Sequence, residues 1–259
     1  MKRFSLFFTL AVMTAVVASA QVDIQLHYDF GRLTNPGAES TRPNVTSTVE
    51  AFIPDRLGST YFFVDMDYYS DGIGGAYWEI SREFTFAKAK GNHSFAGHIE
   101  YDGGLKKDKY TGYGASYQQC FLLGPAWNWH NDSFSKTASI QLMYKQYLKQ
   151  TASNLKAHAS FQLTGVWSIT FAKGLCTFSG FADLWYGYVP TWDENGVQKK
   201  DMVFITEPQF WFNIVGRNRQ HKKLSVGTEL ELSNNFIYPS DGYTRTFYFN
   251  PTLAVKYTF

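Results

Sequence analysis

The sequence contains 259 residues, of which 44% are hydrophobic and 18% are aromatic, and its mean hydropathy is −0.27. Its 24 Lys and Arg residues and 22 Asp and Glu residues give a formal net charge of +2 at pH 7. There is no basic excess of the kind that binds nucleic acid and no acidic block that would form a disordered tail. A membrane-spanning helix needs about 20 mostly apolar residues. No such stretch follows residue 20, which excludes an α-helical membrane protein.

Residues 1–20 have the form of a secretory signal peptide. A basic start at residues 1–3 precedes an apolar run over residues 4–17, and Ala18-Ser19-Ala20 fits the small-residue cleavage pattern. The apolar run is too short to be a good spanning helix. We therefore expect an exported protein whose mature chain, residues 21–259, is a single domain.

The mature chain reads as a series of amphipathic strands. In each run, apolar and polar side chains alternate with a period of two, as in a strand with one apolar and one polar face. The runs are Val22–Arg32, Val45–Ile53, Thr60–Tyr69, Ala76–Phe86, Ser94–Asp102, Tyr113–Trp129, Thr137–Leu148, Lys156–Phe171, Leu175–Val189, Met202–Ile214, Leu224–Asn234 and Thr246–Phe259. Many of them reach the roughly 9–11 residues that a tilted strand needs to cross a bilayer, whereas ordinary strands average about five or six.

The links between these runs alternate in length. Short links carry tight-turn residues, and the longer links are Leu33–Asn44, Gly103–Gly112, Pro190–Asp201 and Asn235–Arg245. Short periplasmic turns that alternate with long outer loops are typical of outer-membrane barrels. The sequence therefore predicts an all-β protein, an antiparallel up-and-down transmembrane β-barrel of about twelve strands in the bacterial outer membrane. A soluble β-sandwich is the alternative, because alternation alone does not distinguish lipid from a protein core.

The last strand carries the clearest pattern. Leu253, Val255, Tyr257 and Phe259 share one side, and a terminal aromatic on such a strand resembles the signal read by the barrel-assembly machinery. We predict that Tyr257 and Phe259 form this assembly signal. Arg82 conflicts with the pattern, because it shares the apolar side of its strand, where a mid-membrane charge would cost about 2–4 kcal/mol. A bulge or a position near the lipid headgroups would relieve the conflict.

With the apolar sides toward lipid, the inner side of the barrel combines carboxylates with aromatic rings. The predicted lumen-lining residues are Tyr61, Phe63, Asp65, Asp67, Tyr77, Glu79, Glu83, Glu100, Asp183, Trp185, Glu207 and Trp211. Asp102 follows Glu100 on the same side of its strand. Such a lining would form a narrow aqueous path in which carboxylates hydrogen-bond polar solutes and rings stack on flat or sugar-like faces. The alternative is that these charges pair with one another in a purely structural network.

Three blocks of sequence resemble the nucleoside-specific outer-membrane channels of the Tsx type. They are Val49–Phe52, which has a Glu-Ala-Phe strand end, the acidic and aromatic strand Tyr61–Asp67, and Tyr77–Phe84; the C-terminal strand is also similar. The resemblance implies a twelve-stranded monomeric barrel that passes nucleosides by facilitated diffusion, with Glu79 facing the lumen. The family's Pro-Arg-Phe strand ending appears here as Arg82-Glu83-Phe84, so no other ligand contact is carried over.

An enzyme is the competing class. Outer-membrane phospholipases use a Ser–His–Asn arrangement, and His158 with Ser160 is the nearest pair in this sequence. A spacing of two on a strand is common by chance, because such catalytic groups are recognised by geometry and not by sequence position. No metal-binding or phosphate-loop motif occurs, so we expect no enzyme activity and no cofactor.

The expected partners are outer-membrane lipid, the barrel-assembly machinery and a small solute such as a nucleoside, with no nucleic acid. We expect a monomer in which Cys120 and Cys176 are free thiols, since they lie on well-separated strands with opposite parity. Two alternatives stay open at this point. One is a structural or surface-binding barrel plugged by the Leu33–Asn44 or Pro190–Asp201 loop, and the other is a lipid hydrolase.

Overall fold

The computed structural model describes residues 20–35, 42–107, 112–152, 154–215, 224–237 and 246–259. The predicted signal peptide lies outside these residues except for its last position. The strands are β1 (Gln21–Asp29), β2 (Val45–Asp55), β3 (Gly58–Tyr69), β4 (Gly72–Ala89), β5 (His93–Lys107), β6 (Gly114–Ser116), β7 (Cys120–His130), β8 (Lys136–Tyr147), β9 (His158–Phe171), β10 (Cys176–Trp192), β11 (Gln198–Thr206), β12 (Gln209–Val215), β13 (Leu224–Asn234) and β14 (Phe247–Thr258). The helical segments are α2 (Gly31–Thr34) and the 3-10 turn η1 (Ala172–Gly174). No helix in the described part of the chain is long and apolar enough to cross a bilayer.

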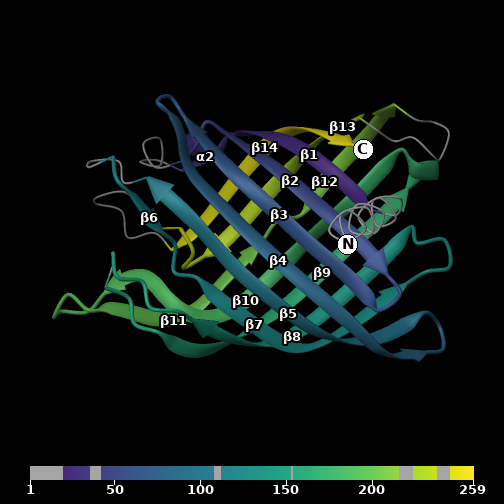
Figure 1. Ribbon diagram of the computed structural model, residues 1–259. Coiled ribbons are helices and arrows are strands. Elements are labelled where there is room, and N and C mark those ends of the chain that lie inside the picture. The colour runs from purple at the N-terminus through teal and green to yellow at the C-terminus, as the bar shows by residue number, and fades with distance from the viewer. Residues whose placement is uncertain (1–19, 36–41, 108–111, 153, 216–223, 238–245) are drawn as a thin grey trace, which may run out of the picture.

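The strands form one antiparallel sheet that closes on itself (Figure 1). Apart from β6 and β7 and from β11 and β12, successive strands of the chain pair with each other, and β1 pairs with β14 to complete the wall. β11 and β12 both pair with β10 and β13, so they are two segments of one wall strand. β6 pairs with β5, as β7 does, and extends the same wall strand. Counted this way, the described residues build a closed barrel of twelve strands, which confirms the predicted fold class.

The break between β11 and β12 has a local cause. Proline lacks the N–H that a central strand donates, so Pro208 interrupts the ladder between Thr206 and Gln209. The neighbouring strand accommodates this break with Gly180, whose φ of +152° favours glycine. A Cβ on Gly180 would lie 2.5 Å from the backbone oxygen of Glu207. The predicted continuous strand over residues 202–214 is therefore interrupted at its centre.

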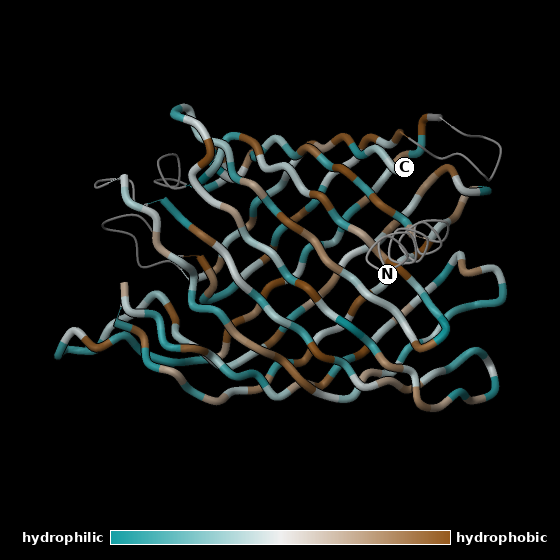
Figure 2. Tube along the Cα trace, in the orientation of Figure 1, coloured by the Kyte–Doolittle hydropathy of each residue, from teal (hydrophilic) through white to brown (hydrophobic). Residues whose placement is uncertain are grey.

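Hydrophobic and hydrophilic residues alternate along the strands (Figure 2), and their burial places the large apolar side chains on the outside of the wall and the polar ones on the inside. On β14, Leu253 and Val255 are 59% and 46% exposed, whereas Asn250 and Ala254 on the opposite face are 0% and 1% exposed. A closed wall with large apolar side chains outside and polar ones inside is the arrangement of a transmembrane barrel. Exposing the apolar outer surface to water would be unfavourable, and contact with lipid tails avoids this cost. The protein is thus a bacterial outer-membrane β-barrel, as the sequence predicted.

Arg82 lies on the outer face at the rim of this barrel. Its Nη1 and Nη2 atoms donate to the two carboxylate oxygens of Asp55, at 2.7 and 2.8 Å. Asp55 is the last residue of β2, beside the turn to β3, and Nη1 also lies 3.1 Å from the hydroxyl of Thr60. The charge therefore sits at the level of a turn, where headgroups and water are close, and not at mid-membrane. This position resolves the conflict that the sequence raised.

The two ends of the barrel differ. β1 begins and β14 ends at the right-hand end of Figure 1, where β2 and β3, β4 and β5, and β7 and β8 are joined by short turns. We call this the turn end, and we call the opposite end, where residues 30–35, 42–44 and 148–152 lie, the loop end. Because outer-membrane barrels have short periplasmic turns, we expect the turn end to be the periplasmic one, although the loop end also has short turns at residues 70–71 and 193–197. The predicted long link Pro190–Asp201 is wrong, since β10 and β11 continue to Trp192 and from Gln198 and leave only residues 193–197 as a turn.

Candidate functional site

The inner face of the barrel is acidic. Among the described residues, carboxylates facing inward are Asp23, Asp29, Glu50, Asp65, Asp67, Glu79, Glu83, Glu100, Asp102, Asp183, Glu207, Glu229 and Glu231. The lysine and arginine side chains facing inward among them are fewer: Arg42, Lys106, Lys145 and Lys256. All twelve residues predicted to line the lumen lie on this inner face, but whether they contact a solute stays a prediction.

Aromatic rings follow one another along β3 and β4. The ring centroids of Tyr61 and Phe63 are 6.2 Å apart, and those of Phe63 and Tyr77 are 5.9 Å apart. Tyr117, which the sequence did not single out, adds a ring 6.1 Å from Tyr77. The Tyr77 hydroxyl donates to Glu79 Oε1 at 2.8 Å. The structure thus joins four predicted residues into one strip of rings and a carboxylate, which we call the aromatic strip.

Three carboxylates beside the aromatic strip accept hydrogen bonds from the wall itself. Thr48 and Thr46 on β2 donate to Asp65 and Asp67 at 2.5 and 2.8 Å. The hydroxyl of Tyr61 donates to Glu50, also on β2, at 3.3 Å. These bonds fix the side chains of neighbouring strands in register, so the strip has a defined surface.

His98 connects two predicted carboxylates. Its Nε2 lies 3.0 Å from Glu100 and its Nδ1 lies 3.3 Å from Glu83. Glu83 also accepts from Asn128 at 2.7 Å and from Gln141 at 3.2 Å. These residues come from β4, β5, β7 and β8, so the bonds cross strands that are not neighbours and show that the side chains project inward. Glu83 is therefore tied into a network rather than open to solvent on all sides.

Lys145 is a buried cation on β8, which pairs with β7 on the side away from β5. Its Nζ lies 2.6 Å from Gln162 Oε1 and 3.4 Å from Asp102 Oδ2. The rings of Tyr147 and Trp185 lie 5.3 and 5.1 Å from the same nitrogen, within the range of cation–π attraction. The predicted residue Trp185 thus serves partly as packing for this charge. Its neighbour Asp183, which is also predicted, accepts from Thr164 at 2.5 Å.

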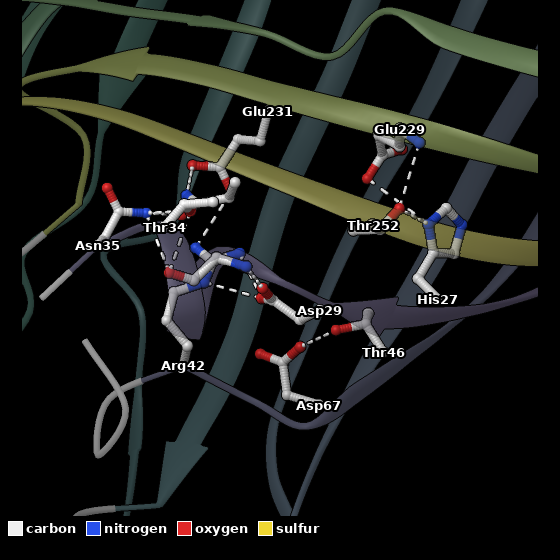
Figure 3. Close-up of polar contacts among 12 residues, drawn as sticks. His27, Asp29, Thr34, Asn35, Arg42, Thr46, Asp67, Glu229, Glu231 and Thr252 are labelled. Carbon is white, nitrogen blue, oxygen red and sulfur yellow. Dashed lines mark hydrogen bonds and ion pairs between the residues drawn. The ribbon is translucent and has the colours of Figure 1, made fainter.

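A third cluster lies inside the loop end (Figure 3). Arg42 forms ion pairs with Asp29 on β1 at 2.6 Å and with Glu231 on β13 at 3.2 Å. Asn35 donates to Asn250 at 2.6 Å, and Asn250 donates to Glu231 at 2.8 Å. Burial alone would lower the pKa of Arg42, but the charges and hydrogen bonds of Glu231 and Asp29 outweigh it and raise that pKa. The ends of the predicted Leu33–Asn44 loop are therefore anchored to the inner wall.

Trp211 lies on β12, outside the strands that carry the aromatic strip, whereas the buried carboxylate of Glu207 is close enough to Asp65 and Glu79 to interact with them electrostatically. Trp211 is fully buried, with Lys256 Nζ 4.2 Å from its ring and His27 packed edge-on at 6.0 Å. Its Nε1 donates to Gln209 at 2.9 Å. A side chain covered in this way has no face left for stacking on a solute. Glu207 lies at the break between β11 and β12, and its backbone N–H donates to the carbonyl of Phe181 at 3.1 Å.

Sequence reasoning did not single out Lys145, Arg42 or the bridging role of His98. Lys145 falls within a predicted strand, on the same side as Gln141, so strand parity alone could have placed it inside. His98 likewise shares parity with Glu100. Arg42 lies in a predicted loop, where no periodicity indicates direction, so no signal in the sequence marked it.

Comparisons with solved structures agree with the barrel fold. The NanC porin superimposes with a TM-score of 0.55 at 7% sequence identity, over 91% of this chain and 98% of that one. OccAB3 of Acinetobacter baumannii gives a TM-score of 0.42 at 9% identity, over 83% of this chain and 55% of that one. A search of curated proteins found no match. The finer resemblance to nucleoside-specific channels is not confirmed by these matches and remains a prediction.

A family model described as "Domain of unknown function (DUF5020)" matches residues 20–259. This match covers the whole barrel, from the residue before β1 to the last residue of the sequence. The chain therefore belongs to the DUF5020 family, whose barrel here has a porin fold and an acidic inner face.

Proposed function

We propose that this protein is an outer-membrane channel that passes small polar solutes by facilitated diffusion, and that nucleosides are the preferred solutes. The observation that carries the proposal is the aromatic strip, in which Tyr61, Phe63 and Tyr77 lie beside Glu79 on the inner face. Rings can stack on a base, while carboxylates accept hydrogen bonds from hydroxyl and amino groups. The NanC porin, which has the same fold, is described as a porin, and this likeness supports the channel class.

The energetics suit passage rather than retention. Stacking contributes about 1–3 kcal/mol per base and tolerates different bases. A conducting site must bind strongly enough to admit a solute and weakly enough to release it. We therefore expect millimolar affinity, which corresponds to about 4 kcal/mol. The excess of carboxylates inside the barrel opposes anions, so nucleosides should pass faster than nucleotides of similar size.

The test is solute entry into vesicles that contain the purified protein. Nucleosides should enter faster than in protein-free vesicles and faster than the corresponding nucleotides. Glu79→Gln should change nucleoside flux or ion selectivity without lowering the yield of folded barrel. Glu194→Gln, in the exposed 193–197 turn, is the matched control and should leave flux unchanged. If no nucleoside or sugar enters faster than in protein-free vesicles, the channel proposal fails.

The rings allow a second, independent variant. Phe63→Leu removes the central ring of the aromatic strip and should slow nucleosides more than a small sugar that does not depend on stacking. Phe161→Leu, on the outer face of β9, removes a ring that is 44% exposed toward lipid and should leave both rates unchanged. Equal slowing of nucleoside and sugar would mean that Phe63 only shapes the path.

A structural barrel without transport is the second candidate, and the loop-end cluster favours it. Arg42 and Asn35 project side chains from the β1–β2 link onto the inner wall, where they narrow the loop end. Single-channel recording separates the two candidates, since a plugged barrel would show no conductance in any salt. The flux comparison above then becomes unnecessary.

We do not favour an enzyme. His158 stacks on Tyr147 with 4.5 Å between centroids, and its Nδ1 lies 3.2 Å from the carbonyl of Lys156. Ser160 donates to the carbonyl of Tyr186. The two side chains thus engage different partners, which gives no support to a nucleophile and base pair. Our proposal also includes a monomer that is exported by a signal peptide and inserted by the barrel-assembly machinery.

A further inference from the structure

We propose that Glu79, Glu100 and Asp102, which we call the carboxylate trio, bind a divalent cation of the calcium type inside the barrel. Glu79 on β4 is directly opposite Asp102 on β5, and Glu100 is two residues from Asp102 on the same face. One oxygen from each of the three carboxylates lies within 4.8 Å of the others. Carboxylate oxygens in such a group are the ligands that hard cations such as Ca²⁺ prefer.

A second observation, independent of the clustering, points to a ligand. Asp102 is only 4% exposed, and its Oδ1 is buried without a hydrogen-bond partner among the described residues. Its other oxygen, Oδ2, accepts from Cys120 Sγ at 3.0 Å and from Lys145 at 3.4 Å. A buried acceptor left without a partner is destabilising, and more so when it is charged. A cation ligated by Oδ1 would remove this cost.

The other two carboxylates are held in place from behind. Tyr77 donates to Glu79 Oε1 at 2.8 Å, and His98 Nε2 lies 3.0 Å from Glu100 Oε2. In metal sites, partners of this kind orient the ligating groups and leave the remaining oxygens for the ion. Each member of the trio thus has one oxygen engaged by the protein and a second oxygen to offer.

The balance of charge also favours a divalent ion. Lys145 is the lysine beside the trio, but its shortest polar contact, at 2.6 Å, is with the amide oxygen of Gln162 and not with a carboxylate. Asp183, whose partner is the neutral hydroxyl of Thr164, adds a further carboxylate on the adjoining wall. One ammonium leaves most of the negative charge of these four carboxylates unbalanced, and a divalent cation would offset a further part of it. The inference goes beyond the channel proposal and does not depend on solute passage.

Terbium provides the test, because Tb³⁺ occupies calcium sites and emits when a nearby aromatic side chain is excited. Folded barrel in detergent, first stripped with a chelator, should show saturable sensitised emission, with Tyr77 as the adjacent donor. Ca²⁺ should displace Tb³⁺ with a dissociation constant on the order of 10⁻⁴ to 10⁻³ M, the range of extracellular calcium modules. Asp102→Asn and Glu79→Gln should each weaken binding by at least about tenfold.

Glu229→Gln is the matched control, because it removes an inward carboxylate on β13, across the barrel, and should leave Tb³⁺ affinity unchanged. Ca²⁺ should also raise the temperature at which the wild-type barrel unfolds on heating, but not that of Asp102→Asn. Absence of saturable emission, or equal affinity in wild type and Asp102→Asn, would overturn the proposal. Vesicle flux is measured separately, so loss of metal binding and loss of transport can be told apart.

Discussion

Single side chains inside this barrel are rarely alone. Glu83, for example, has contacts from His98, Asn128 and Gln141, which come from three other strands. Arg42 likewise sits between two carboxylates, and its side chain is only 13% exposed. Charged groups that are buried this deeply need partners, because the free-energy cost of removing a charge from water is offset only by attraction to, and hydrogen bonds with, neighbouring groups. The side chains that line the barrel therefore also affect its stability, since the loss of one partner would destabilise the fold.

Arg42→Ala should destabilise the barrel, because it leaves Asp29 and Glu231 facing each other without their shared cation. Removing one partner of a buried ion pair costs about 3–5 kcal/mol, and we expect a loss on the order of 3 kcal/mol in denaturant unfolding of the detergent-solubilised protein. Arg32→Ala is the control, since Arg32 contacts the neutral Asn44 at 2.7 Å from the same segment. Equal losses for the two variants would contradict a special role for the ion pairs. The double change Arg42→Ala with Glu231→Gln should recover part of the loss.

At the scale of whole strands, a period of two was enough to assign faces. Leu230 and Leu232 face outward and Glu229 and Glu231 face inward, as their alternation predicted. Alternation does not give the stagger between strands, so it could not show that Gln141 on β8 reaches Glu83 on β4. Alternation also missed the break at Pro208. Predicting that break would have required giving the missing N–H of proline more weight than the hydrophobic pattern. The candidate site was therefore predicted as a set of residues, and its contacts were not.

The last strand offers a prediction at this scale. Deleting Phe259 should lower the yield of folded barrel far more than Leu253→Ala, although both side chains are outward and well exposed, at 66% and 59%. Any barrel that does form should lose no more than about 1.5–3 kcal/mol, the value of burying one Phe side chain. Quantifying folded protein in isolated outer membranes checks this. Equal yields for the two variants would count against Phe259 as an assembly signal.

At the scale of the molecule, a closed wall should resist detergent until heated. The protein should fractionate with the outer membrane and migrate differently on gels before and after boiling. Gly227→Ala should reduce the amount of protein in the gel band of the folded, unboiled barrel, because a Cβ there would lie 2.3 Å from the backbone oxygen of Phe210. Gly97→Ala is the matched control, since a Cβ at Gly97 meets no atom within 4 Å. Recovery of the wild type as a free periplasmic protein would contradict the barrel.

The seam between β1 and β14 has a consequence for how the chain must be made. His27 and Thr252, which meet across this seam at 3.1 Å, are separated by 225 residues. Contacts between such distant segments form late and slowly. Until the final strand arrives, both margins of the growing sheet expose unpaired backbone groups that can capture other chains. Nearly the whole polypeptide must therefore reach the membrane before the barrel can close and its strand edges are protected from aggregation. A chain truncated before β14 would form an open sheet with two unpaired edges rather than a smaller barrel.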